Sequence, residues 1–259
     1  MISNYHTHTH RCGHASAERE RAYIEKAIEL SMKELGFADH APMPFDNGYR
    51  SGIRMLPEKI EDYVNTLLSL REEYKNDIKI RIGFEAEYYP EVFDSFISLI
   101  SDYPIEYLIL GQHYRGNEYD GLGYYGAATD SEEMLTAYVD QVIAGLSTGK
   151  FTYLAHPDLI NYIGDSEIYS REINRLTDFV VKNDIPVEIN LHGIHENKNY
   201  PNKDFWRIAS AAGCKALLGC DAHSPNGLAR AEAIKKAEEL IKENKGLKLI
   251  EKVELKSIK

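Results

Sequence analysis

The sequence has no long apolar run, few cysteines and no excess of positive charge, and each lack argues against a class of protein. Its apolar stretches are short, such as Tyr107–Leu110, whereas a membrane-spanning helix needs about 20 apolar residues. The first residues have neither the basic start nor the apolar core of a secretory signal peptide. Three cysteines in 259 residues do not form a disulfide framework. We therefore expect a cytoplasmic protein without membrane contact.

The charge balance disfavours one kind of partner and suits another. Thirty Lys and Arg face 41 Asp and Glu, a net charge of −11. Proteins that bind long nucleic acids need basic patches, so we expect no long nucleic acid as a partner. A surplus of carboxylates suits a protein that holds divalent cations.

The chain reads as one domain, residues 1–259. Its composition, 43% apolar and 27% charged, is that of a globular protein. Glycine and proline are scattered, and no linker, low-complexity tract or internal repeat interrupts the chain.

Short apolar runs alternate with amphipathic segments along the whole sequence. The runs predict strands over residues 2–8, 34–40, 78–88, 107–114, 151–156, 186–191 and 215–221. Helical spacing between them predicts helices over 60–74, 135–146, the stretch after 170, the stretch after 202, and 229–242. The expected helix boundaries are a capping box at Thr129 and Glu132, N-caps at Ser170 and Asn202, and a C-terminal stop at Gly213. Seven strand–helix units imply a parallel sheet covered by helices.

Histidines mark the ends of these strands. Seven of the ten lie at or just past the carboxyl end of a predicted strand, where Glu85 and Asp221 also lie; they are His6, His8, His14, His40, His113, His156 and His223. In a parallel α/β barrel all these ends meet on one rim, where barrel enzymes place their chemistry. An open doubly wound sheet would spread them along a line. A TIM-like barrel with seven strand–helix units therefore explains the pattern better.

These nine residues form a candidate metal site. His6 and His8 are two residues apart, as are Asp221 and His223, so each pair points to one side of its strand. Imidazole and carboxylate together suit Zn²⁺, Fe²⁺ or Mn²⁺. A single strand-end histidine is more often structural, but repetition on successive strands favours ligands. Nine ligands exceed the needs of one ion and predict two or three divalent ions.

The same residues, in order, are similar to the motifs of the polymerase-and-histidinol-phosphatase (PHP) superfamily. The matching motifs are His6-Thr-His8 with His14, Asp39-His40, Gly83-x-Glu85, Gly111-Gln-His113, Ala155-His156-Pro157 and Asp221-Ala-His223. Within the superfamily, the segment 8–15 with its cysteine and the segment 156–159 most resemble the histidinol-phosphatases. This resemblance implies a distorted (β/α)7 barrel and a phosphatase of the histidinol-phosphatase type.

The resemblance also implies how the ligands are grouped. His6, His8, Glu85 and Asp221 would hold one ion. Glu85 would bridge to a second ion held by His113 and His156. The third ion would be held by His14, His40 and His223.

The chain departs from the family pattern in the segment that would bind phosphate. Many relatives carry an arginine after strand six, whereas residues 191–198 here contain none. His195 and Lys198 are possible substitutes, and Arg54 and Arg115, in predicted rim loops, are further candidates for substrate binding. Arginine suits bidentate phosphate contact.

The implied reaction is hydrolysis of a small phosphorylated metabolite, L-histidinol phosphate, to L-histidinol and phosphate. A metal cluster lowers the pKa of bound water from about 15.7 to about 7, and the resulting hydroxide, held at Glu85, would attack phosphorus. Asp221, His192 and His195 are candidates to protonate the leaving group. Open alternatives are a phosphoesterase of the same scaffold acting on nucleotides, sugar phosphates or short oligonucleotides, and, less favoured, a non-catalytic metal-binding module. Amidohydrolase chemistry would need a lysine at a strand end, which the sequence lacks.

Overall fold

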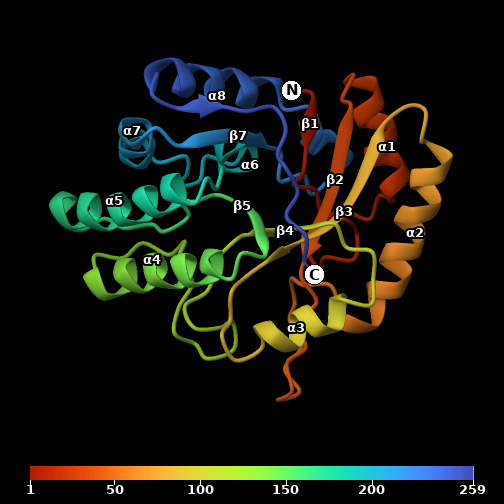
Figure 1. Cartoon of the computed structure of the whole chain (residues 1–259), viewed down its shortest axis with the longest axis horizontal. Coiled ribbons are helices and arrows are strands. Elements are labelled where there is room, and N and C mark those ends of the chain that lie inside the picture. The colour runs from red at the N-terminus through yellow and green to blue at the C-terminus, as the bar shows by residue number, and fades with distance from the viewer. Residues whose placement is uncertain (259) are drawn as a thin grey trace.

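A computed structural model describes residues 1–258, and within them one curled sheet of eight parallel strands is surrounded by helices (Figure 1). The strands are paired in chain order: β1 (Ser3–Asn4), β2 (Glu34–His40), β3 (Lys79–Ala86), β4 (Tyr107–Leu110), β5 (Phe151–Leu154), β6 (Val187–Asn190), β7 (Lys215–Gly219) and β8 (Lys248–Leu249). The predicted α/β barrel with seven strand–helix units is confirmed. The eighth strand has two residues and pairs only with β7.

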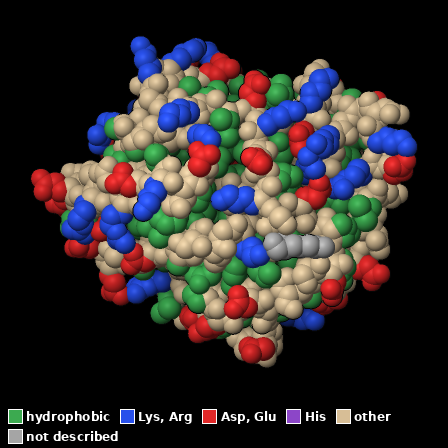
Figure 2. Space-filling model, viewed as in Figure 1, with side chains coloured by type: hydrophobic (Ala, Val, Ile, Leu, Met, Phe, Trp, Pro, Cys, Tyr) green, Lys and Arg blue, Asp and Glu red, His purple; other side chains and the backbone are tan. Residues whose placement is uncertain are grey.

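The helices follow the strands in alternation. They are α1 (Glu20–Glu29), α2 (Ile60–Glu73), α3 (Phe93–Ile100), α4 (Glu132–Ser147), α5 (Ser166–Lys182), the one-turn α6 (Leu191–His195), α7 (Lys203–Ala212) and α8 (Ala231–Glu243), with 3₁₀ turns η1 (Pro57–Lys59) and η2 (Pro225–Leu228). None of the helices in the described chain is long and apolar enough to cross a membrane. On the face in Figure 2, acidic and basic side chains are interspersed.

Two of the predicted helix boundaries are confirmed and two are wrong. Asn202 caps α7 through its side-chain oxygen, and Gly213 ends the helix with φ 76°. The N-cap of α4 is Ser131, not Thr129, and its hydroxyl accepts from Met134 N. The N-cap of α5 is Asp165, whose carboxylate accepts from two backbone amides, so Ser170 lies inside the helix. In both cases another residue of a type that favours N-cap positions lies nearby in the sequence and caps the helix instead.

The first strand is shorter than predicted because Asn4 turns the chain out of the ladder. Its amide donates to His6 O at 3.1 Å and to Thr7 Oγ1 at 2.7 Å. The backbone then bridges to the segment after β7: His8 N donates to Ala222 O, and Ala222 N donates to His6 O. This bridge brings the two ends of the sheet together at its carboxyl side.

Tyrosines fill the inside of the curled sheet. Tyr5, Tyr107 and Tyr153 are fully buried there, and Tyr107 Oη donates to Tyr5 O at 2.8 Å. From the opposite end to the histidines, the C-terminal segment packs Val253 and Leu255 against this cluster. Lys256 N donates to Thr152 Oγ1 at 3.1 Å. The interior is therefore a packed core.

Candidate metal centre

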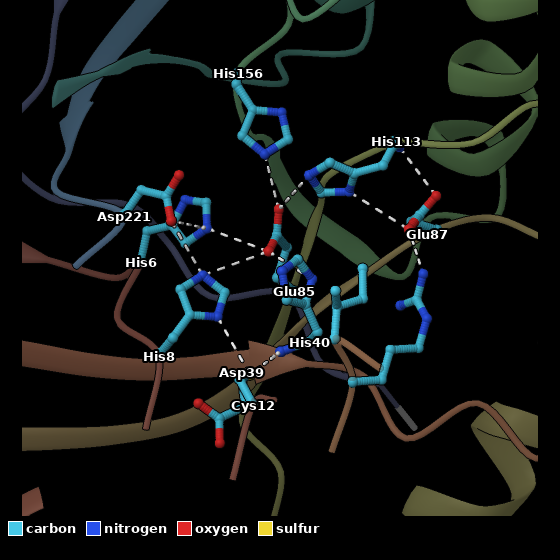
Figure 3. Close-up of polar contacts among 12 residues, drawn as sticks. His6, His8, Cys12, Asp39, His40, Glu85, Glu87, His113, His156 and Asp221 are labelled. Carbon is cyan, nitrogen blue, oxygen red and sulfur yellow. Dashed lines mark hydrogen bonds and ion pairs between the residues drawn. The ribbon is translucent and has the colours of Figure 1, made fainter. Parts of the chain in front are cut away.

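The Glu85 carboxylate lies at the centre of a ring of imidazoles (Figure 3). It comes from the end of β3 and is 1% exposed. Its Oε2 faces His40 Nδ1 at 3.1 Å, His6 Nε2 at 3.4 Å and His8 Nε2 at 3.5 Å. Its Oε1 faces His156 Nε2 at 2.8 Å and His113 Nε2 at 3.8 Å. Each oxygen thus faces a separate set of nitrogens, the geometry that a bridging carboxylate needs.

Asp221 adds a second carboxylate on the Oε2 side of Glu85. Its Oδ1 lies 3.1 Å from His8 Nε2 and 3.6 Å from His6 Nε2, and Asn190 donates to Oδ2 at 3.1 Å. His6, His8 and Asp221 form a group of three donors that could hold one ion. The placement of these four residues, Glu85 included, agrees with the expected first ligand group.

The other expected groups also lie on the rim, in a looser arrangement. His113 and His156 both face Glu85 Oε1, and their rings are 4.8 Å apart. His14 Nε2 lies 2.7 Å from His223 Nε2, and the His14 and His40 rings are 5.1 Å apart. His40 also belongs to donor groups with His8 and His223 and with Glu85 and His113. The structure therefore brings all nine predicted residues to one site.

Several of the donor atoms that face the two carboxylates have no hydrogen-bond partner. These buried nitrogens are His6 Nε2, His8 Nε2 and His40 Nδ1. Burying polar atoms without partners is costly. Imidazole nitrogens that converge on carboxylate oxygens suit divalent ions of the zinc, iron or manganese type. The clusters are able to bind metal ions on this ground.

Burial keeps most of these imidazoles in the neutral form that binds metal. It lowers the pKa of His8 and His40, and it lowers the pKa of His14 and His223 to about 4. Burial alone would raise the pKa of the Asp221 carboxyl, but the neighbouring His6 holds that pKa well below its usual range. Burial also opposes a charge on His6 and His113, yet the carboxylates of Glu188 and Glu87 raise the pKa of these two imidazoles. The site therefore combines several neutral imidazoles with ionised carboxylates near pH 7.

Two site residues hold the backbone in the left-handed region. The φ angle is 46° at Asp221 and 26° at His156, although neither is glycine. Such conformations cost about 1–3 kcal/mol and persist where surrounding contacts impose them. Each residue lies two positions past the end of its strand, at the rim, where His156 faces Glu85 and Asp221 faces His8.

A layer of buried groups behind the site holds the imidazoles in place, and sequence reasoning missed it. Glu188 Oε2 lies 2.9 Å from His6 Nδ1, and its Oε1 accepts from Asn190 at 2.7 Å. Glu87 Oε1 lies 3.4 Å from His113 Nδ1. The signal was available: Glu188 precedes Asn190 by two residues and Glu87 follows Glu85 by two, the same spacing that marks His6 and His8.

Replacing Glu188 by Gln is expected to weaken metal binding about 10- to 100-fold, as removal of partners behind metal ligands does. Both carboxylate oxygens accept hydrogen bonds, so the amide nitrogen of Gln would face either His6 or Asn190 with donor against donor. Competition with a chromophoric chelator measures the affinity. Glu34→Gln, a buried glutamate at the start of β2, is the matched control. Equal affinity in both variants would show that Glu188 does not support the site.

Only one of the four predicted substrate-binding residues lines the central cavity. This cavity, about 450 Å³, includes Lys198, with Tyr114, Tyr124, His192, Glu196 and Tyr200 as further lining residues. Arg54 is buried behind the site, paired with Glu87 and with Glu118 at 2.6 Å. Arg115 pairs with Glu133 at 2.5 Å, and His195 faces a different cavity beside Ser224.

Acidic partners from other parts of the fold account for the two arginines. Arg54 and Arg115 lie in rim loops, as predicted, but Arg54 pairs with Glu87 and Glu118, which follow other strands, and Arg115 pairs with Glu133 in α4. His195, the last residue of the one-turn α6, lines the cavity beside Ser224, whereas His192 lines the central cavity. A pairing between distant loops is invisible in a single sequence.

Comparison with known proteins identifies relatives of this chain. The family model described as "PHP domain" matches residues 4–192. A "Probable histidinol-phosphatase" of Deinococcus radiodurans is 26% identical over 92% of this chain and 94% of its own. The "Histidinol-phosphatase" of Bacillus subtilis is 32% identical over 42% of each chain.

A solved structure shares the fold. The histidinol phosphate phosphatase of Lactococcus lactis, in complex with zinc, L-histidinol and phosphate, superposes with a TM-score of 0.75 over 100% of this chain and 98% of its own, at 22% identity. The family model spans well over half of the sequence and ends within α6, after seven of the nine rim residues. The chain therefore belongs to the PHP domain family.

Proposed function

We propose that this chain hydrolyses L-histidinol phosphate to L-histidinol and phosphate, with the whole chain acting as one metallophosphoesterase domain. The observation that carries the proposal is the Glu85 carboxylate, whose two oxygens face separate sets of imidazoles. Full-length similarity to a relative named as a histidinol-phosphatase supports the choice of substrate.

We assign the nine rim residues to two or three divalent ions, of zinc, manganese or iron. His6, His8, Glu85 and Asp221 would hold one ion, and Glu85 would share a second with His113 and His156. His14, His40 and His223 would hold the third. When bound, such ions lower the pKa of a water molecule and neutralise charge on the phosphoryl oxygens.

The protein's own residues supply orientation and proton transfer. Asp221 lines the cavity and would take the proton of the attacking water and return it to the leaving oxygen as the P–O bond breaks. Lys198 would attract the dianionic phosphate. Glu196, also in the cavity lining, offers a carboxylate to the ammonium group of the substrate, and Tyr114 and Tyr124, with rings 5.6 Å apart, offer a wall for its imidazole.

The test is kcat/KM for phosphate release from L-histidinol phosphate beside p-nitrophenyl phosphate, on enzyme supplemented with each metal in turn. A ratio of roughly 10³ or more corresponds to about 4 kcal/mol of differential transition-state binding and would support the assignment. A ratio near one would discard histidinol phosphate and direct the search to nucleotides and sugar phosphates. Inactivity on both esters with full metal content would overturn phosphatase function. A Glu85→Gln preparation controls for contaminating phosphatase.

A further inference from the structure

His192 lies in the cavity beside the metal centre but outside every donor group. It is the second residue of α6, whose N-cap Asn190 accepts from Gly193 N at 2.8 Å. The ring centroid lies 5.1 Å from that of His223, and the residue lines the central cavity. A histidine in this place could bind a metal ion, donate a proton or bind the substrate. The contact made by its Nδ1 distinguishes these roles, because it determines which ring nitrogen carries the hydrogen.

Arg230 contacts the Nδ1 atom of His192 and fixes its protonation. Its Nη2 lies 2.9 Å from His192 Nδ1, and its Nη1 donates to Cys220 O at 3.0 Å. A guanidinium has donors only, so Nδ1 must be the acceptor and must carry no hydrogen. The hydrogen of the neutral ring therefore lies on Nε2. This tautomer rules out a ligand role for His192, because its one free lone pair faces Arg230.

Arg230 also differs from Arg54 and Arg115 in that its charge is left available. Arg54 and Arg115 are neutralised by glutamates. Among residues 1–258, by contrast, no carboxylate forms an ion pair with Arg230, whose partners are a ring nitrogen and a backbone carbonyl. The His192 ring thus separates the positive charge of Arg230 from the cavity. This charge lies in the region where the sequence lacks the arginine expected after β6.

We infer that His192 is a fixed Nε2–H donor that binds a non-bridging oxygen of the substrate phosphate, and that Arg230 is the residue that positions it. The inference rests on the proposed phosphatase function but not on the identity of the alcohol. His192 does not protonate the leaving group, because giving up the Nε2 hydrogen would leave an imidazolate while Arg230 blocks reprotonation at Nδ1. That proton transfer stays with Asp221.

The test compares two phosphate esters and inorganic phosphate. In His192→Ala, kcat/KM for L-histidinol phosphate and for p-nitrophenyl phosphate is expected to fall by the same factor, roughly 10- to 100-fold, and the inhibition constant of inorganic phosphate to rise by a similar factor. His192→Gln keeps an acceptor for Arg230 and an N–H for phosphate, so partial rescue is expected. His195→Ala, one turn away and facing the other cavity, is the matched control. Metal content is measured in every variant.

The positioning role of Arg230 is tested by the tautomer of His192, which a purely structural role of Arg230 would not change. In ¹⁵N spectra of the enzyme, His192 is expected to show hydrogen on Nε2 and none on Nδ1. Arg230→Met should mix the two tautomers and raise the phosphate inhibition constant, whereas Arg230→Lys should retain much of both; the Lys variant also serves if the Met variant is unstable.

The outcomes separate this inference from the substrate assignment. A loss on L-histidinol phosphate alone, with p-nitrophenyl phosphate unaffected, would make His192 a proton donor or a contact to the alcohol and overturn the inference. Unchanged phosphate inhibition in His192→Ala would do the same. A wild-type ratio near one between the two esters would discard histidinol phosphate as the substrate, yet the effect of His192→Ala on phosphate would still stand.

Discussion

Substituting Glu85 by Gln is expected to reduce kcat/KM by roughly 10³-fold or more and to lower the metal bound per chain. Only a carboxylate can present an anionic oxygen to both sides of the site, to His40 and His6 on one and to His156 on the other. The amide nitrogen of Gln cannot ligate, so one side loses its bridge. Elemental analysis of dialysed protein and steady-state kinetics measure the two effects.

The control for this variant is Glu61→Gln, an exposed position on α2 that leaves the rim untouched. It should match wild type in both measurements. If Glu85→Gln kept its activity and its full metal content, the bridging role of Glu85 would be refuted, and with it the main support for the proposed function.

Substituting Gly111 by Ala is expected to be almost as damaging, about 10²-fold or more in kcat/KM, although Gly111 carries no functional group. Gly111 follows β4, and a Cβ at this position would overlap Glu85 Oε1 and lie 2.7 Å from its Cδ. Glu85 is buried and closely surrounded, so it cannot move aside without leaving the imidazoles. Displacing a reacting group by about 1 Å costs on the order of 10²-fold. Kinetics and metal content are measured as for Glu85.

Gly52→Ala is the matched control, since a Cβ there meets no atom within 4 Å. A melting temperature close to that of wild type would show that Gly111→Ala is folded. Shortening the carboxylate in the double variant Glu85→Asp, Gly111→Ala makes room for the new methyl group. The two substitutions should therefore be less than additive. Wild-type activity in Gly111→Ala would show that the Glu85 position is not as tightly fixed as the structure indicates.

The convergence of the candidate metal ligands was predictable because it follows from one rule of parallel sheets. His40, His156 and Asp221 are far apart in sequence, but each lies at a strand end, and strand ends converge when the sheet curls. Errors in strand length did not matter. The predicted first strand ran to residue 8, whereas β1 ends at Asn4, yet His6 and His8 reach the rim through the bridge to Ala222.

Side chains whose roles depend on a distant partner were not predictable. The sequence suggests that Arg54 is an exposed phosphate binder. In the structure, Glu118 accepts a hydrogen bond from its guanidinium. In the sequence, nothing distinguishes His192 from the other histidines outside the ligand set. Its tautomer is fixed by Arg230, which lies 38 residues later. The segment after β8 was likewise overlooked: Val253 and Leu255 alternate with charged residues and resemble a surface strand, but they pack against the interior core.

The contact between the two ends of the sheet has a consequence for synthesis on the ribosome. The backbone of residues 6–8 is bonded to Ala222, and the core around Tyr5 is completed by Val253 and Leu255. Residues made first must therefore wait for residues made more than 200 positions later before the sheet can curl and close. His6 and Asp221 belong to these two ends, so the candidate ion site that they share cannot assemble on the growing chain until the segment after β7 has emerged. Metal loading should accordingly be a late event, coupled to the final closure of the fold.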